Sequence, residues 1–95
     1  MELIPCLITT KHKGVLLGFI NPETIKSTTI EAFRARFCVY WSKAMKGVLG
    51  LAVMGPDRDC RIGPSVESCV LHDVTGVFRV TEAALRAWEV APWTR

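Results

Sequence analysis

The fold is decided first by residues 3–20, which read LIPCLITTKHKGVLLGFI. Leu3 to Thr10 and Gly14 to Ile20 are apolar and rich in β-branched residues, and the polar Lys11-His12-Lys13 separates them. Two such runs joined by a short polar segment are typical of a β-hairpin. The sequence therefore predicts that the chain begins with two antiparallel strands.

The next stretch predicts a turn at Asn21-Pro22-Glu23, followed by two strand-like segments, Thr24 to Ile30 and Phe33 to Trp41. A bend is expected between these segments, near Glu31-Ala32. A helix is the alternative for the second segment, because three aromatic residues in it also fit one helical face: Phe33, Phe37 and Tyr40.

The second half of the chain predicts shorter elements. Gly47 to Met54 is apolar and bounded by glycine and proline, which favours a short helix over a strand. Asp57 to Pro64 is a polar loop punctuated by glycine and proline. Val66 to Leu71 and Val74 to Val80 are the last expected strands, joined around His72-Asp73.

The chain ends with a predicted helix over Glu82 to Val90. Thr81 can cap this helix because its hydroxyl can accept from unsatisfied amides, and Ala84, Leu85 and Trp88 would then share one face. These elements predict a single α+β domain over residues 1–95. We expect a small twisted antiparallel sheet or partly closed barrel, with a short central helix and a C-terminal helix.

Composition narrows the function classes. Twelve basic and nine acidic residues give a formal charge of +3, and this charge is spread along the chain. The balance argues against an acidic DNA mimic, and the lack of a basic stripe makes nucleic acid an unlikely partner. The 49% hydrophobic content favours a homo-oligomer. With no leader or membrane-spanning run, we expect a bacterial cytoplasm and no membrane.

The reactive side chains form no recognisable catalytic or metal-binding motif. The four cysteines and two histidines lack ligand-pair spacing, so we expect reduced thiols, no metal and no cofactor. No nucleophile or phosphate-loop motif is present, which predicts that the protein is not an enzyme. Gly14 and Gly18 are expected to permit a bulge or a close backbone approach in a strand.

Two segments carry the candidate ligand site. Tyr40, Trp41 and Ser42 combine aromatic faces with a hydroxyl, which suits a nucleobase. Arg58 and Arg61 could clamp a phosphate through parallel hydrogen bonds. The alternatives are packing for the aromatic residues and local loop structure for the arginines, which have Asp57 and Asp59 beside them.

The remaining cations and tryptophans receive structural interpretations. Arg34 and Arg36 are expected to belong to a solvated surface, together with Lys46 and the Lys11-His12-Lys13 segment. Trp88 and Trp93 are expected to serve packing or a subunit contact.

Several stretches resemble a family of small proteins encoded by tailed bacteriophages and prophages. They are Cys38 to Lys43, Gly47 to Ala52, Gly55 to Pro64, Lys13 to Gly18, and the ending Ala91-Pro92-Trp93. The resemblance implies a phage accessory protein and supplies no catalytic residues.

These observations predict an anti-defence protein that binds and sequesters a small anionic, nucleotide-derived immune signal without chemistry. Sequestration needs only tight binding and high protein abundance. The alternative is a protein-interaction inhibitor of a host defence enzyme, such as a CRISPR effector, acting through an exposed apolar patch.

Overall fold

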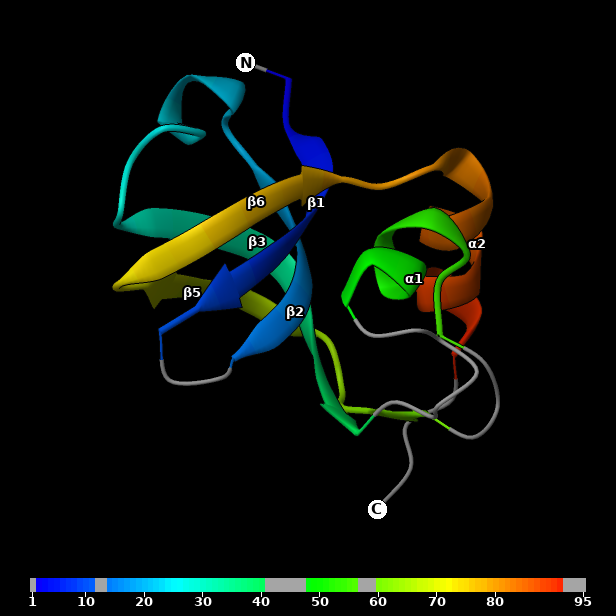
Figure 1. The fold of residues 1–95 in the computed structure, drawn as a ribbon. Coiled ribbons are helices and arrows are strands. Elements are labelled where there is room, and N and C mark those ends of the chain that lie inside the picture. Colours follow the sequence, from blue (N-terminus) through cyan, green and yellow to red (C-terminus); the bar gives the residue numbers. More distant parts are fainter. Residues whose placement is uncertain (1, 12–13, 41–47, 57–59, 92–95) are drawn as a thin grey trace.

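The computed structural model describes residues 2–11, 14–40, 48–56 and 60–91, and these residues form an α+β fold, as the sequence predicts (Figure 1). The described elements in chain order are β1 (Ile4–Thr10), β2 (Val15–Ile20), η1 (Pro22–Thr24), β3 (Ile30–Tyr40), α1 (Val48–Val53), β4 (Arg61–Ile62), β5 (Val66–Leu71), β6 (Val74–Arg79) and α2 (Glu82–Val90).

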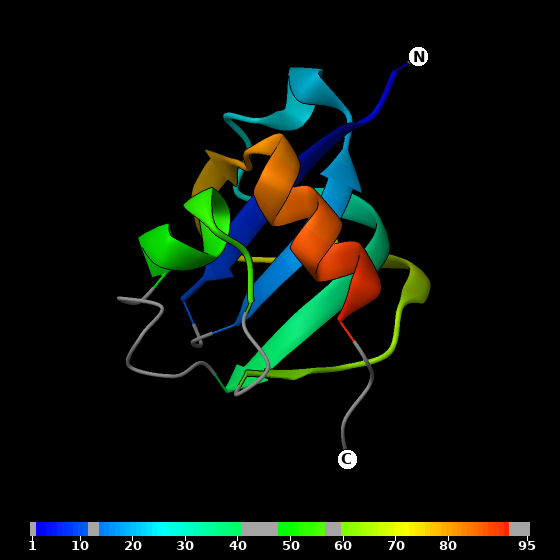
Figure 2. The same cartoon turned by 90° about the vertical axis from the view of Figure 1, so that its right-hand side faces the viewer.

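The strands form one antiparallel sheet in the order β4-β3-β2-β1-β6, and β5 also pairs with β3. The predicted hairpin is confirmed, since Ile4 pairs with Ile20 and Thr9 with Val15. In the described part of the chain β6 pairs with β1 and β5 pairs with β3, so the sheet is open rather than a closed barrel. Both helices lie on one side of this sheet (Figures 1 and 2).

The strand predicted over Thr24 to Ile30 is wrong. Asn21 accepts a hydrogen bond from the Glu23 amide at 3.0 Å, and Pro22 occupies the first turn of η1, so local capping outweighs the β-propensity of the threonines and isoleucines. The bend predicted at Glu31-Ala32 is also wrong, because β3 runs through both residues. Strand β3 also excludes the helix considered for Phe33 to Trp41, since β3 extends to Tyr40.

The later elements agree more closely with the sequence. A short helix, α1, occupies the region predicted for it, and α2 has the predicted bounds, with Thr81 accepting from the Ala84 amide at 3.0 Å. The connection at His72-Asp73 joins β5 to β6, and Asp73 has a φ of 54°, a conformation that aspartate tolerates better than most residues. The two joined strands nevertheless pair with different neighbours, β3 and β1.

Two apolar clusters occupy the two faces of the sheet. The inner cluster comes from strands alone and consists of Cys6, Ile8, Leu16, Ile20, Ile30, Ala32, Ala35 and Leu71. The helix-side cluster combines the opposite face with the helices and consists of Leu7, Val15, Leu17, Cys38, Leu51, Ala52, Cys60, Ile62 and Trp88. Strand alternation explains the division, because neighbouring residues such as Leu7 and Ile8 point to opposite faces.

Polar contacts hold α1 and α2 together. The Trp88 Nε1–H donates to the Leu51 carbonyl at 3.2 Å, and the Thr81 hydroxyl donates to the Val53 carbonyl at 2.6 Å. Gly55 has a φ of 78°, and a Cβ there would lie 2.6 Å from the Ala87 Cβ. The packing role predicted for Trp88 is thus confirmed. Neither described helix has the length of apolar sequence that a membrane span requires.

Candidate functional site

The central irregularity of the sheet is a β-bulge in β3. Leu17 pairs with Arg36 and Phe19 with Phe33, so two β3 residues, Arg34 and Ala35, stand opposite the single residue Gly18. Such an extra residue increases the local twist and re-aims side chains. After the bulge, Ala35 continues the inner cluster, and Arg36 lies on the helix side of the sheet.

The bulge forces unusual geometry at its centre. Arg34 has a φ of 50°, a left-handed conformation that costs a non-glycine residue about 1–2 kcal/mol. Gly18 provides the space on the facing strand, because a Cβ at this position would lie only 2.8 Å from the Ala32 Cβ. The close backbone approach expected at Gly18 is therefore present. Strained backbone of this kind clusters at functional sites, which directs attention to Arg34.

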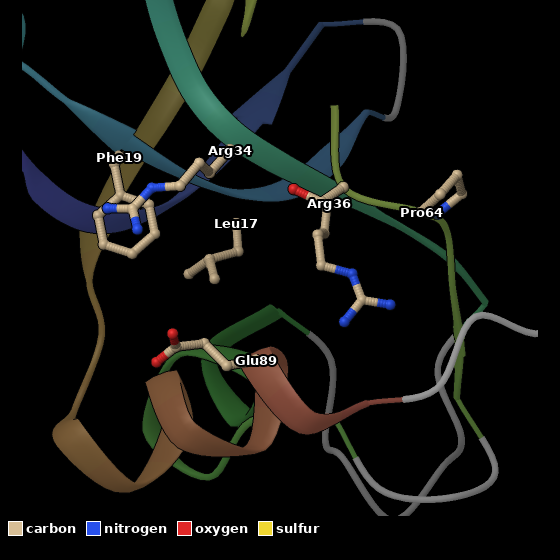
Figure 3. A pocket seen from close by; sticks show the side chains of 7 residues that line it. Leu17, Phe19, Arg34, Arg36, Pro64 and Glu89 are labelled. Carbon is tan, nitrogen blue, oxygen red and sulfur yellow. The ribbon is translucent and has the colours of Figure 1, made fainter. Parts of the chain in front are cut away.

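The Arg34 side chain lies over the Phe19 ring, with its guanidinium carbon 4.0 Å from the ring centroid (Figure 3). A cation above an aromatic face gains about 0.5–1 kcal/mol at exposed sites. The ring supports one face of the guanidinium and does not engage its N–H donors. No described residue accepts a hydrogen bond from those donors, so they can bind an anion.

Arg36 is fixed by two carbonyl groups. Its Nε–H donates to the Gly63 carbonyl at 2.9 Å and its Nη1 donates to the Trp88 carbonyl at 2.8 Å. The second of these carbonyls lies in the last turn of α2, where backbone acceptors lack partners within the helix. Burial lowers the pKa of the Arg36 guanidinium. Arg36 thus joins the β4–β5 connection to the end of α2, and the hydrogen bonds to described residues leave Nη2 able to donate to a ligand.

These two arginines contribute to a pocket of about 310 Å³ between the sheet and α2 (Figure 3). We call it the arginine pocket, and its lining consists of Leu17, Phe19, Arg34, Arg36, Pro64, Ser65 and Glu89. Two guanidinium groups against one carboxylate give the described part of this lining a net positive charge. The ion pair described on α2 joins Arg86 to Glu82 at 3.0 Å and does not involve Glu89.

The ligand site predicted from the sequence lies elsewhere. Tyr40 and Arg61 are register partners of β3 and β4, so the fold does bring these two backbone positions together. Arg61 is exposed and is not part of the arginine-pocket lining. Trp41, Ser42 and Arg58 lie outside the described residues, so the predicted site as a whole stays a prediction.

Arg34 and Arg36 were missed as site residues, and the surface role expected for Arg36 is wrong because this side chain is half-buried between two carbonyls. The run Phe33-Arg34-Ala35-Arg36-Phe37 contains a sequence pattern that could have indicated these two arginines as site residues. Two arginines two residues apart on one strand point to the same face when alternation is regular. Their meeting with α2, however, depends on contacts that are distant in the sequence.

Cys60 and Cys69 lie on opposite faces of the sheet and do not form a common site. Cys60 belongs to the helix-side cluster, whereas Cys69 packs against the inner cluster on the opposite face. Burial raises the pKa of the Cys69 thiol, and burial outweighs the lowering effect of Arg79 on the pKa of Cys6. Raised thiol pKa values disfavour the thiolate that nucleophilic or metal chemistry needs.

A comparison with known protein families matches residues 3–88 to DUF6948, described as a domain of unknown function. The chain belongs to the DUF6948 family. No curated protein and no solved structure matches it. The matched residues include every described strand and α2 as far as Trp88, so the DUF6948 match contains the arginine pocket except for Glu89.

Proposed function

We propose that this DUF6948 domain binds a small anionic, nucleotide-like ligand in the arginine pocket without chemical turnover. The observation that carries the proposal is that Arg34 and Arg36 both line one pocket, which the Phe19 ring also lines. Guanidinium groups suit phosphate because they present several N–H donors in a fixed plane.

Preorganisation supports this proposal. Arg36 is held by two carbonyls before any ligand arrives, and Arg34 rests on an aromatic ring, so binding would immobilise little additional side chain. Reducing the ordering cost leaves more of the interaction energy for affinity. The pocket volume of about 310 Å³ lies at the lower end of the usual range for small-molecule sites.

The lining residues favour binding over catalysis. Ser65 and Glu89 supply a hydroxyl and a carboxylate to the arginine pocket, and none of its described lining residues is a histidine that could activate the serine. Glu89 would instead accept a hydrogen bond from a ligand hydroxyl.

Within this proposal, the domain is a phage accessory protein that sequesters a nucleotide-derived immune signal in the host cytoplasm as a homo-oligomer. Sequestration works by mass action and requires abundant protein with ligand returned intact. Native mass spectrometry, followed by identification of the released small molecule, would measure subunit number and cargo together.

Calorimetric titration with AMP and GMP at low salt tests the arginine pocket. Arg34→Gln removes a charged donor and should weaken binding about 10-fold or more. Arg86→Gln is the matched control, since Arg86 lies on the exposed side of α2 in a pair with Glu82, and it should leave affinity within about 2-fold.

The same titration separates the structural proposal from the site predicted from the sequence. Arg61→Gln should have no more effect than the Arg86→Gln control. A loss of affinity in Arg61→Gln with none in Arg34→Gln would move the site to the β3–β4 end of the sheet.

A protein-interaction inhibitor is the second candidate. Val66 and Val70 are exposed on β5, which pairs with β3 along one edge in the described sheet. Exposed apolar residues on an edge strand suit a protein partner. Val70→Lys should abolish capture of a host defence enzyme if this candidate is correct, and should leave nucleotide binding unchanged if the arginine pocket is the site.

A further inference from the structure

A second pocket adjoins the arginine pocket on the same face of the sheet. It has a volume of about 360 Å³ and is lined by Leu3, Asn21, Thr24, Glu31 and Phe33. We call it the Phe33 pocket. Phe33 is the register partner of Phe19 and the chain neighbour of Arg34, both of which line the arginine pocket. Side chains of directly opposite residues lie about 4.5–5.5 Å apart at Cβ, so the two phenylalanines form a shared wall.

We infer that the Phe33 pocket binds the base of the same nucleotide-like ligand and that Glu31 selects a base of the guanine type. This inference rests on the proposed binding of the phosphate by Arg34 and Arg36. Phe33 supplies an aromatic wall on which a planar base can stack.

The opposite charges of the arginine pocket and the Phe33 pocket fix the orientation of the ligand across the two pockets. Arg34 and Arg36 attract the anionic group, and the Glu31 carboxylate repels it from the Phe33 pocket. Glu31 is three residues from Arg34 on one strand, so the backbone span is at most roughly 10 Å at 3.3 Å per residue, and the bulge at Arg34 shortens it. An extended nucleoside monophosphate can cover such a span, with its phosphate at the arginines and its base at Glu31.

Among the described lining residues, Glu31 supplies the charged hydrogen-bond acceptor of the Phe33 pocket. The oxygen acceptor of Asn21 and the hydroxyl hydrogen of Thr24 are already used locally, since Asn21 Oδ1 accepts from the Glu23 amide at 3.0 Å and the Thr24 hydroxyl donates to the Asn21 carbonyl at 2.7 Å. Glu31 is exposed and forms no ion pair with the described parts of the chain. An ionised carboxylate only accepts hydrogen bonds, so it needs a ligand that donates.

Guanine meets this requirement better than adenine. Its N1–H and N2–H₂ groups stand side by side and can donate in parallel to both oxygens of one carboxylate. Adenine places the N1 acceptor beside its N6–H₂ donor, so one carboxylate oxygen would face a lone pair. A good bidentate contact of this kind discriminates between bases by about 10-fold or more.

Calorimetric titration of the full chain with GMP, AMP and ribose 5-phosphate tests the inference. We expect GMP to bind about 10-fold more tightly than AMP. Glu31→Gln should remove this preference and leave the affinity for ribose 5-phosphate unchanged. Glu67→Gln is the matched control, since Glu67 is an exposed carboxylate on β5 outside both pockets, and it should keep the preference.

The outcomes separate this inference from the function on which it rests. Equal affinities for all three ligands, each weakened by Arg34→Gln, would overturn base selection and preserve anion binding. A GMP preference that persists in Glu31→Gln would also overturn it. Failure of all three ligands to bind would overturn the proposed function together with the inference.

Discussion

The inner and helix-side faces of the sheet are built on the same strands, β1 to β3, but they are packed in different ways. On the inner face, strand side chains meet one another, and the inner cluster contains only apolar residues and a cysteine. On the helix side, α1 and α2 join the packing. Hydrogen bonds from Trp88 and Thr81 reach α1, and one from Arg36 connects β3 to α2. The arginine pocket lies on this second face, where apolar packing ends and a guanidinium spans the gap between sheet and helix.

In a domain of 95 residues, one face of the sheet can supply most of the stability while the other face carries the binding site. A fully buried aliphatic side chain stabilises the fold by about 1.5–3 kcal/mol, so the inner cluster can supply much of the stability of a small domain. The helix side then carries polar groups and open volume without loss of the fold. We expect the helix side to be the less stable layer.

The largest expected effect is that of Trp88→Ala. Trp88 is fully buried and its indole joins α2 to α1, so removing the ring should lower the free energy of unfolding by about 3–5 kcal/mol. Native-state hydrogen exchange should show faster exchange in α1 and α2, with strand amides retaining most of their protection. Urea unfolding measures the total loss.

Leu16→Ala provides the matched comparison on the inner face, where it should cost about 2–5 kcal/mol. Amide hydrogen exchange in Leu16→Ala should become faster in strands and helices alike, because the helices pack on the sheet and lose their support when it is destabilised. If Trp88→Ala exposed the strands as much as Leu16→Ala does, the two faces would be one cooperative unit and the comparison would fail.

Gly18→Ala is expected to have an intermediate effect. The new Cβ would lie 2.8 Å from the Ala32 Cβ opposite the bulge, and overpacking of this kind costs about 1–3 kcal/mol. Adding Ala32→Gly removes the clash, so the double variant should recover part of the loss in urea unfolding. If the changes in unfolding free energy of the two single variants simply added in the double variant, the Gly18–Ala32 contact would not be the cause of the Gly18→Ala destabilisation.

Arg34→Asn should have the smallest effect on stability, within about 1 kcal/mol of the parent chain. Asparagine tolerates the left-handed conformation better than arginine, and this gain offsets the lost contact with Phe19. Anion affinity should nevertheless fall about 10-fold in the calorimetric titration.

Arg36→Ala is the contrasting variant for this prediction. It removes two charged hydrogen bonds to carbonyls and should cost about 1.5–3 kcal/mol in urea unfolding. A large loss of stability in Arg34→Asn would show that Arg34 serves the sheet itself and not a ligand.

Local sequence was sufficient for elements whose signals lie within a few residues. The hairpin of β1 and β2 follows from two apolar runs around a polar segment, and α2 follows from the Thr81 cap and its apolar face. The strand expected at Thr24 to Ile30 does not form, because the Asn21 cap and Pro22 outweigh the β-propensity of this segment. Residue chemistry along the chain points to Arg58 and Arg61 as the anion site, because Arg34 and Arg36 stand among apolar residues in the sequence.

The α+β class, the hairpin and the capped C-terminal helix follow from local sequence, because residue periodicity and helix capping act between residues a few positions apart. The choice of neighbouring strands, the β3 bulge opposite Gly18 and the contact of Arg36 with Trp88 arise from tertiary packing. Arg36 and Trp88 are 52 residues apart, and the bulge depends on how β2 and β3 fit together. Such contacts depend on the packing of distant segments, which no local pattern specifies.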